Sequence, residues 1–320
     1  MIKLITPKNN STISLLRKEH IDFIADPTAA ECVCLSDASF PAPAVFSFEP
    51  PIDAEIILAD SHGRQTTVKA KNGQAKTYNL LIGEKYSWRV KCGLMTSEEH
   101  CFFTDPTPPR MLYAEGISNL RDIGGFETTD ERLIKQGMVY RSTESDKNYS
   151  ITENGRNTLI NELGIKTELD VRGINGEATA SAFPRDKIKR LNIPLSAYGE
   201  IFNEQQMAAY KSAFELFAVP SSYPILIHCQ SGMDRTGTLI FILGALVGAD
   251  EGDLMLDYEM SSFSTWGRRS RTSPEFSEFL DKLHSYGASA RQAAEGFLTA
   301  CGVTNDNLKR IRDILTEEKE

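Results

Sequence analysis

The sequence lacks any apolar run close to the roughly 20 residues that a membrane-spanning helix needs. Its first residues, 1–8, also lack the apolar core of about 7–15 residues that a secretory signal carries. The chain has fewer basic than acidic residues, with 35 Lys and Arg and 44 Asp and Glu, which gives a net charge of −9. A nucleic-acid partner would require a basic face. We therefore expect a cytoplasmic protein with no transmembrane segment and no nucleic-acid partner.

Cysteine is scarce as well, with six in 320 residues, and four of the six lie in the first third of the chain. These are Cys32, Cys34, Cys92 and Cys101. A disulfide or a zinc site is conceivable here, but the spacing lacks the paired Cys-x-x-Cys of zinc knuckles. Cys32 and Cys34 are two residues apart, which places both on one face of a strand, where buried thiols are common. We therefore favour a structural role for these thiols.

Residues 1–107 are predicted to form an all-β domain. Short runs of alternating apolar and polar residues are separated by turn formers, at intervals typical of a β-sandwich. The runs are 45–48, 54–58, 67–70 and 86–92.

Aromatic residues mark the last of these runs. Tyr86 and Trp88 could form a binding face for a protein partner, but aromatic side chains dominate sandwich interiors, so we favour core packing. The segment from Tyr78 to Val90, with its Tyr-x-Trp-x-Val strand, resembles fibronectin type III modules. The resemblance implies a fibronectin III-like or immunoglobulin-like sandwich.

Residues 105–110 read Asp-Pro-Thr-Pro-Pro-Arg and are predicted to form a stiff linker. Proline removes a backbone donor and restricts the residue before it, so neither sheet nor helix continues through this segment. We place the domain boundary here, with a sandwich over 1–107 and a second domain over 108–320.

Beyond the linker, strand-like and helix-like patterns alternate, which is typical of an α/β domain. Strands are expected at 123–126, 138–141, 167–171 and 190–194, the last at a sheet edge. Helices are expected at 152–163, 204–217, 252–262, 274–285, 288–299 and 305–315.

The most informative stretch is 228–238, which reads His-Cys-Gln-Ser-Gly-Met-Asp-Arg-Thr-Gly-Thr. An apolar run at 223–227 leads into it and another at 239–247 leads out, which predicts a buried strand, a tight loop and a helix. Such a loop directs its amide N–H groups and the positive end of the helix at one small volume. The pattern therefore predicts an anion site at the carboxyl end of a central strand.

The residue types in the loop suit attack on a phosphate ester. Cys229 faces the loop amides and the helix N-terminus, which lower the pKa of a thiol and favour the thiolate. Arg235 carries a planar guanidinium that can grip two phosphoryl oxygens. Gly232 permits backbone angles and a close approach that a Cβ would block.

Two further side chains complete the expected chemistry. Thr236 could hydrogen-bond the sulfur and help it leave in a second step. Asp234 is the candidate proton donor, provided that the nearby thiolate and phosphate raise the pKa of its carboxyl. Gln230 and Ser231, with the two residues after them, are expected to bind the phosphoryl group, and no metal or other cofactor is needed. The competing interpretation is a buried structural cysteine beside a solvated Asp-Arg pair.

The stretch resembles the signature loop of cysteine-dependent phosphatases, and in particular the bacterial tyrosine phosphatase family whose loop reads His-Cys-x-x-Gly-Lys-Asp-Arg-Thr-Gly. That family includes atypical lipid phosphatases. Further matches occur at 119–126, 137–142 and 163–172, so the resemblance covers about 110–315. It implies that Asp234 is the general acid. Met233 stands where the family has lysine, which removes a charge useful for a second phosphate and offers a flexible apolar surface.

Weaker candidates lie outside the loop. Asp170 follows another strand and is a second candidate proton donor, although a structural role such as holding Arg235 is favoured. Arg172 could contact substrate or pair with a carboxylate. The basic run 266–271 could rim the site and attract anions, or form a solvated surface loop. His228 is expected to bind the backbone around the loop.

The leading hypothesis is a metal-independent phosphatase that acts on phosphotyrosine, with phosphoserine and phosphothreonine as further substrates. One alternative is a phosphatase for phosphoinositides or inositol phosphates, which Met233 counts against. The other is a phosphate-binding scaffold whose chemistry has lapsed, with the sandwich domain binding a protein partner.

Overall fold

The computed structural model describes residues 2–27, 37–173 and 181–319. The chain divides into two compact units. The first consists of Met1–Ile21 and Pro41–Leu112, and the second of Asp22–Phe40 and Tyr113–Glu320. The boundary expected after residue 107 lies close to the last of these divisions. The sequence did not predict that Asp22–Phe40 belongs to the second unit.

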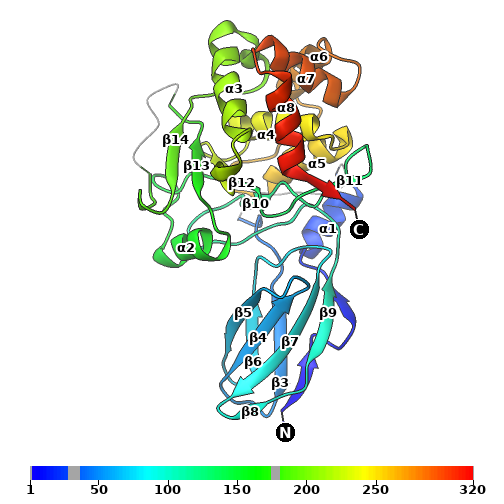
Figure 1. Ribbon diagram of the computed structural model, residues 1–320, viewed down its shortest axis with the longest axis vertical. Helices are drawn as coiled ribbons and strands as arrows, with labels where there is room; N and C mark the ends of the chain where they lie inside the picture. Colours follow the sequence, from blue (N-terminus) through cyan, green and yellow to red (C-terminus); the bar gives the residue numbers. More distant parts are fainter. Residues whose placement is uncertain (1, 28–36, 174–180, 320) are drawn as a thin grey trace. The chain divides into compact units, whose positions relative to one another are not determined.

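The first unit contains two β-sheets (Figure 1). The smaller sheet has the order β1 (Lys3–Thr6), β3 (Ala44–Glu49), β6 (Gln74–Thr77). The larger has the order β2 (Ser11–Ile13), β9 (His100–Thr104), β7 (Lys85–Cys92), β4 (Ala54–Asp60), β5 (Gln65–Ala70), with β8 (Met95–Thr96) paired to β7. The four strands expected from the alternating runs are confirmed.

The two sheets pack face to face around one apolar core. Phe46 from the smaller sheet and Trp88 from the larger belong to the same buried cluster, with ring centroids 5.1 Å apart in an edge-on arrangement. Trp88 is fully buried and Tyr86 is buried beside it, which confirms core packing for these aromatics. The unit is therefore a β-sandwich.

The cysteine predictions can be followed only in part. Cys92 and Cys101 are free thiols, as expected for structural cysteines. Cys32 and Cys34 lie outside the residues that the structure describes.

The second unit has a five-stranded sheet and helices, and is therefore the α/β domain that the alternating pattern predicted. The sheet has the order β10 (Arg121–Asp122), β12 (Val139–Ser142), β15 (Ile225–His228), β13 (Thr167–Asp170), β14 (Lys189–Asn192). All neighbouring pairs are parallel except β10 with β12. A separate antiparallel pair joins β11 (Arg132–Ile134) to β16 (Thr316–Glu318). The strand that leads into the signature loop, β15, is therefore central.

The helices have the bounds α1 (Lys18–Ala25), α2 (Glu153–Asn157), α3 (Glu204–Phe217), α4 (Asp234–Val247), α5 (Glu251–Met260), α6 (Pro274–His284), α7 (Ala290–Ala300) and α8 (Asn305–Leu315). Helices α2 to α8 belong to the second unit, and α1 spans the division between the two units at Ile21. Short turns are η1 (Thr158–Glu162), η2 (Tyr198–Phe202), η3 (Pro220–Ser222) and η4 (Ser261–Phe263). Figure 1 shows α3, α4, α6, α7 and α8 gathered together, with α2 apart from them. Helix α4 is buried along nearly its whole length because it packs against α5, α7 and α8.

One predicted strand is wrong. Residues 123–126 do not form a strand, although Ile123 and Phe126 are buried in the core. The Asp122 carboxylate instead accepts the Gly124 N–H at 2.9 Å, which closes a turn. A Cβ on Gly124 would lie 2.3 Å from the Lys135 carbonyl oxygen, so this close backbone approach requires glycine.

Within the described residues, no helix has the length and apolar character needed to cross a bilayer.

Candidate active site

The signature loop connects β15 to α4, as the sequence predicted. Strand β15 ends at His228, Cys229 follows it with only 2% of its surface exposed, and α4 begins at Asp234. Met233 precedes the helix and makes no side-chain capping bond. The first N–H groups of an α-helix have no partner within the helix, so these amides and the helix dipole are directed at the loop.

Groups outside the loop hold its first two carbonyls. His228 Nδ1 lies 3.1 Å from the Cys229 carbonyl oxygen. The Glu144 N–H donates to the Gln230 carbonyl oxygen at 3.0 Å. Both carbonyls are therefore directed out of the loop.

The next two carbonyls are held in the same way. Asn119 Nδ2 donates to the carbonyl oxygens of Ser231 at 3.2 Å and Gly232 at 3.1 Å. Arg141 Nη2 also donates to the Gly232 oxygen, at 2.7 Å. A single asparagine side chain thus holds two consecutive peptide groups.

These carbonyl bonds orient the loop amides. In a planar trans peptide, the N–H points opposite to the preceding C=O. Outward carbonyls at four consecutive residues therefore turn the N–H groups of Gln230, Ser231, Gly232 and Met233 inward. Four inward N–H groups at a helix N-terminus form a concave donor surface suited to an oxyanion.

Gly232 occupies the position where the loop crosses β12 most closely. Its φ is +67°, a left-handed conformation that favours glycine. A Cβ at this position would lie 2.2 Å from the Ser142 carbonyl oxygen. Both properties that the sequence analysis assigned to Gly232 are confirmed.

A buried ion-pair cluster supports the groups that hold the loop. Arg121 Nε donates to Asp257 Oδ1 at 2.7 Å, and Arg141 Nη1 pairs with the other oxygen of the same carboxylate. Arg121 Nη1 also contacts the Asn119 side-chain oxygen. Burial alone would raise the pKa of Asp257, but the two guanidinium groups lower it. The carboxylate is therefore ionised and holds both arginines in place.

Sequence reasoning assigned no role to these supporting residues. Asn119, Arg121 and Arg141 lie in the segments 119–126 and 137–142, which resemble the family, so the resemblance could have indicated a role for them. Asp257 lies within α5 and carried no such signal.

The electrostatics around Cys229 favour its thiolate. Burial would raise the pKa of the thiol, and Asp234 adds to this. The positive charge of Arg235 and hydrogen bonds from the Thr236 hydroxyl and N–H outweigh both, so the pKa of Cys229 is lowered. This is the environment expected for a nucleophilic cysteine.

Asp234 has partners that the sequence analysis did not anticipate. Arg269 grips it with two bonds, Nε to Oδ1 at 2.6 Å and Nη2 to Oδ2 at 2.8 Å. The Tyr198 hydroxyl also donates to Oδ1 and lies 2.8 Å from the Tyr258 hydroxyl. Burial alone would raise the pKa of Asp234, but Arg269, Tyr198 and Arg235 lower it. The pKa of Asp234 is therefore shifted in the direction opposite to that expected, because a guanidinium lies against the carboxylate.

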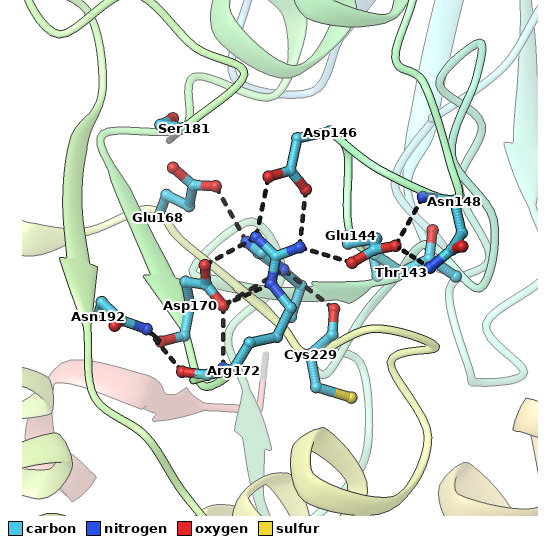
Figure 2. A network of polar contacts seen from close by, with 12 residues as sticks. Thr143, Glu144, Asp146, Asn148, Glu168, Asp170, Arg172, Ser181, Asn192 and Cys229 are labelled. Carbon is cyan, nitrogen blue, oxygen red and sulfur yellow. Dashed lines mark hydrogen bonds and ion pairs between the residues drawn. The ribbon is translucent and has the colours of Figure 1, made fainter. Parts of the chain in front are cut away.

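Arg172 is the centre of a network of ion pairs (Figure 2). It donates to Asp170 Oδ2 at 2.8 Å, to Asp146 Oδ1 at 2.8 Å and to Glu144 Oε2 at 2.5 Å. Arg190 binds Asp170 as well, at 2.6 Å. The Arg172 side chain is 1% exposed, so all of its donors are used inside the protein.

For Asp170 and Arg172, the structure favours the structural alternative given for each, because both pair with oppositely charged side chains. Burial would raise the pKa of Asp170, but Arg172, His228 and Arg190 lower it far below its usual range, which leaves no proton to donate. Arg172 pairs with carboxylates rather than with a ligand. Figure 2 also shows the Cys229 sulfur pointing away from this network.

His228 joins the loop to the same network. Its Nε2 lies 3.0 Å from Glu168 Oε1, and its Nδ1 faces the Cys229 carbonyl. Burial would lower the pKa of His228, but the bond to Glu168 and the charges of Asp170 and Glu168 raise it. A protonated ring donates from both nitrogens. The expectation that His228 binds the backbone around the loop is confirmed.

Met233 differs from its predicted role. Its side chain is fully buried, so it presents no apolar surface to a ligand. Its carbonyl oxygen instead accepts the Gly237 N–H at 2.7 Å. Only the backbone N–H of Met233 is placed to contact a bound anion.

The run 266–271 lies beside the loop, since Arg269 binds Asp234. Trp266 Nε1 donates to the Tyr149 hydroxyl at 2.7 Å, and this hydroxyl lies 2.9 Å from Thr265 Oγ1. Trp266 is 47% exposed. The pair, called the aromatic edge below, lies on two segments that contact the signature loop through Glu144 and Arg269.

A comparison with known protein families identifies the family of the chain. A model of the tyrosine phosphatase family matches residues 112–317, which is more than half of the chain. The chain therefore belongs to the tyrosine phosphatase family and is a phosphatase of the cysteine-based class.

Two solved structures are similar to part of the chain. The core catalytic domain of the PP-IP phosphatase SIW14 from S. cerevisiae, in complex with citrate, is 21% identical, with 45% of this chain and 78% of that chain covered and a TM-score of 0.32. A structure of the Siw14 catalytic core is 23% identical, with 41% and 73% covered and a TM-score of 0.29. None of the curated proteins matches the chain.

Proposed function

We propose that this phosphatase hydrolyses phosphate monoesters through a cysteinyl-phosphate intermediate, with phosphotyrosine as its preferred substrate. One observation carries the proposal. The Cys229 thiol, with a lowered pKa, lies at a loop whose four outward carbonyls turn four amide groups inward. An ionised nucleophile and a set of oxyanion donors in one place are what thiolate attack on phosphorus requires.

In the first step, the Cys229 thiolate attacks phosphorus and the bond to the ester oxygen breaks. The inward amides and Arg235 bind the phosphoryl oxygens, and the carboxyl of Asp234 gives its proton to the departing oxygen. A bound phosphate dianion opposes the ionisation of Asp234 and offsets the effect of Arg269 on its pKa. The products are an alcohol or phenol and the phosphorylated cysteine.

In the second step, water attacks the phosphorus and the sulfur–phosphorus bond breaks. The Asp234 carboxylate takes a proton from this water, and the Thr236 hydroxyl stabilises the departing thiolate. Inorganic phosphate is released, and both Cys229 and Asp234 return to their starting states.

The aromatic edge formed by Tyr149 and Trp266 supports an aryl ester as the preferred substrate. Aromatic rings contribute packing energy beyond the area that they bury. Phosphoserine and phosphothreonine lack a ring for this contact and are expected to react more slowly.

A phosphoinositide or inositol phosphate is the second candidate substrate. Arg269 favours it, because a second guanidinium beside the loop could bind a second phosphate. Parallel measurement of kcat/KM on a phosphotyrosyl peptide, a phosphoinositide and an inositol polyphosphate separates the candidates. A clear preference for either inositol compound would overturn the phosphotyrosine assignment.

Hydrolysis of a chromogenic aryl phosphate tests the mechanism. Activity should persist in a chelator and fall by about a thousandfold or more in Cys229→Ser, because a serine hydroxyl stays protonated at neutral pH. Cys301→Ser is the matched control: this buried thiol has a pKa raised to about 12 by burial, and its loss should leave the rate unchanged. Retention of activity in Cys229→Ser would exclude the covalent route. Absence of activity in the wild type on every phosphate ester would favour a lapsed scaffold.

The sandwich unit is proposed to be fibronectin III-like and to bind a protein partner. Its aromatic residues Tyr86 and Trp88 are used in its own core, so a partner would contact other residues.

A further inference from the structure

Part of the second unit comes from residues that precede the region matched by the tyrosine phosphatase family. The segment Asp22–Phe40 belongs to this unit although its flanking residues belong to the sandwich. The Phe23 ring packs edge-on against Phe263, with centroids 5.3 Å apart, and the Ala38 N–H donates to the Phe263 carbonyl oxygen at 2.9 Å. The segment is thus attached to the unit at both its beginning and its end.

Ser39, near the end of this segment, contacts Asn119, the residue whose side chain holds two carbonyls of the loop. It is 2% exposed, and its Oγ accepts the Asn119 N–H at 2.7 Å. The same hydroxyl donates to Asp37 Oδ1 at 2.6 Å and lies 3.1 Å from Ser118 Oγ. Because the single Ser39 proton goes to the carboxylate, Ser118 is the donor in the last contact. The hydroxyl therefore uses its one proton and both lone pairs.

Asn119 transmits this contact to the loop. Its backbone has a φ of +56°, and its side chain holds the carbonyls of Ser231 and Gly232 outward. The residues whose N–H groups turn inward as a result are Gly232 and Met233. Two of the four loop amides thus depend on where the Asn119 carboxamide lies.

We propose that Ser39 is a positioning residue of the phosphate-binding loop, which acts by fixing the Asn119 peptide and thereby the direction of the Gly232 and Met233 amides. The proposal deepens the proposed function and rests on it, because it presumes that the loop amides bind the phosphoryl oxygens. It follows that the catalytic apparatus extends beyond the family-matched residues 112–317 and includes a segment that the chain supplies between two parts of the sandwich.

Orthovanadate affinity of the full-length protein tests the proposal. Ser39→Ala leaves a buried Asn119 N–H without its acceptor, and the dissociation constant for vanadate should rise about three- to tenfold. Ser39→Thr keeps the hydroxyl and should stay within about twofold of the wild type. Ser39→Cys, close to serine in volume but a weak acceptor, is a second variant that tests the same bond if the alanine protein does not fold.

Thr152→Ala is the matched control for lost stability. Its hydroxyl accepts the Gly155 N–H at 3.1 Å at the start of α2, in the same unit, and donates to Glu115 Oε2 at 2.9 Å. This variant should lower the melting temperature and leave vanadate affinity unchanged. Equal vanadate affinity in wild type, Ser39→Ala and Ser39→Cys would overturn the role of Ser39. Failure of the wild type itself to bind vanadate would instead overturn the proposed function.

Discussion

Asp234 shows how one neighbouring side chain can set the working pH of an acid. Its carboxylate is bound at both oxygens by Arg269, and it also faces Tyr198, Tyr258, Arg235 and the thiolate of the nucleophile. A proton donor must be protonated, so a lowered pKa confines acid catalysis to lower pH. The rate on esters with poor leaving groups should therefore decline as pH rises through the pKa of Asp234.

Arg269→Met should move this decline to higher pH. Removal of the cation raises the pKa of Asp234, so kcat/KM for an alkyl phosphate should fall at a higher pH than in the wild type. Arg271→Met is the matched control, because Arg271 lies in the same run but binds Glu259. Its profile should coincide with that of the wild type.

Asp234→Asn identifies the group that titrates. This variant should slow alkyl phosphates by about a hundredfold or more and activated aryl phosphates far less, because only the former need a proton on the departing oxygen. The decline at high pH should disappear in this variant. Adding Arg269→Met to Asp234→Asn should then leave the pH profile unchanged. Equal losses on both classes of ester would remove Asp234 as the acid.

At the scale of elements, the loop between β15 and α4 depends on a close approach to β12. Gly232 and Gly164 both have a φ of +67°, but only Gly232 has backbone atoms near the position of a Cβ. Alanine substitution at Gly164 therefore measures the effect of a left-handed backbone alone, whereas substitution at Gly232 adds the effect of a steric clash.

Gly232→Ala should abolish vanadate binding and reduce the hydrolysis rate by about a hundredfold or more. Its Cβ would lie 2.2 Å from the Ser142 carbonyl oxygen, so the loop and its amides must shift. Gly164→Ala meets no atom within 4 Å and should lose only about 1 kcal/mol of stability, with the rate unchanged. Normal vanadate affinity in Gly232→Ala would show that the loop tolerates the shift.

At the scale of the whole molecule, each unit is built from two separate parts of the chain. The segment Asp22–Phe40 belongs to the second unit, and the remainder of that unit begins only at Tyr113. Phe23 is 1% exposed within that early segment. Loss of a buried phenylalanine side chain leaves a cavity that the surroundings fill only in part. The early segment should therefore stabilise the phosphatase unit.

Phe23→Ala should lower the free energy of unfolding of the second unit by about 3 kcal/mol. Circular dichroism at 222 nm follows this unit, because helices α2 to α8 belong to it. Fluorescence of Trp88 in a Trp266→Phe background follows the sandwich, since the chain has two tryptophans. In urea titrations, Phe23→Ala should lower the midpoint of the 222 nm transition. The midpoint of the Trp88 fluorescence transition should stay nearly unchanged. An unchanged 222 nm transition would show that the early segment contributes no stability.

The sequence by itself determined the features that depend on neighbouring residues. The strand, loop and helix around Cys229 follow from a continuous apolar run, a glycine and a second apolar run, and helix α3 has the predicted bounds because its periodicity is local. The failure at 123–126 has a cause outside the segment. Buried Ile123 and Phe126 mimic a strand pattern, but the turn at Gly124 requires a backbone contact with Lys135 that the pattern does not reveal.

Only the tertiary structure decided which distant side chains complete the site. Arg269 lies 35 residues from Asp234, and Ser39 lies 80 residues from Asn119. The local sequence placed Arg172 just after a strand, near the loop, but could not show its partners. In the structure its guanidinium donates to three carboxylates. Hydrogen bonds and ion pairs act over a few ångströms and carry no periodic signal along the chain, so their partners become known only when folding brings the segments together.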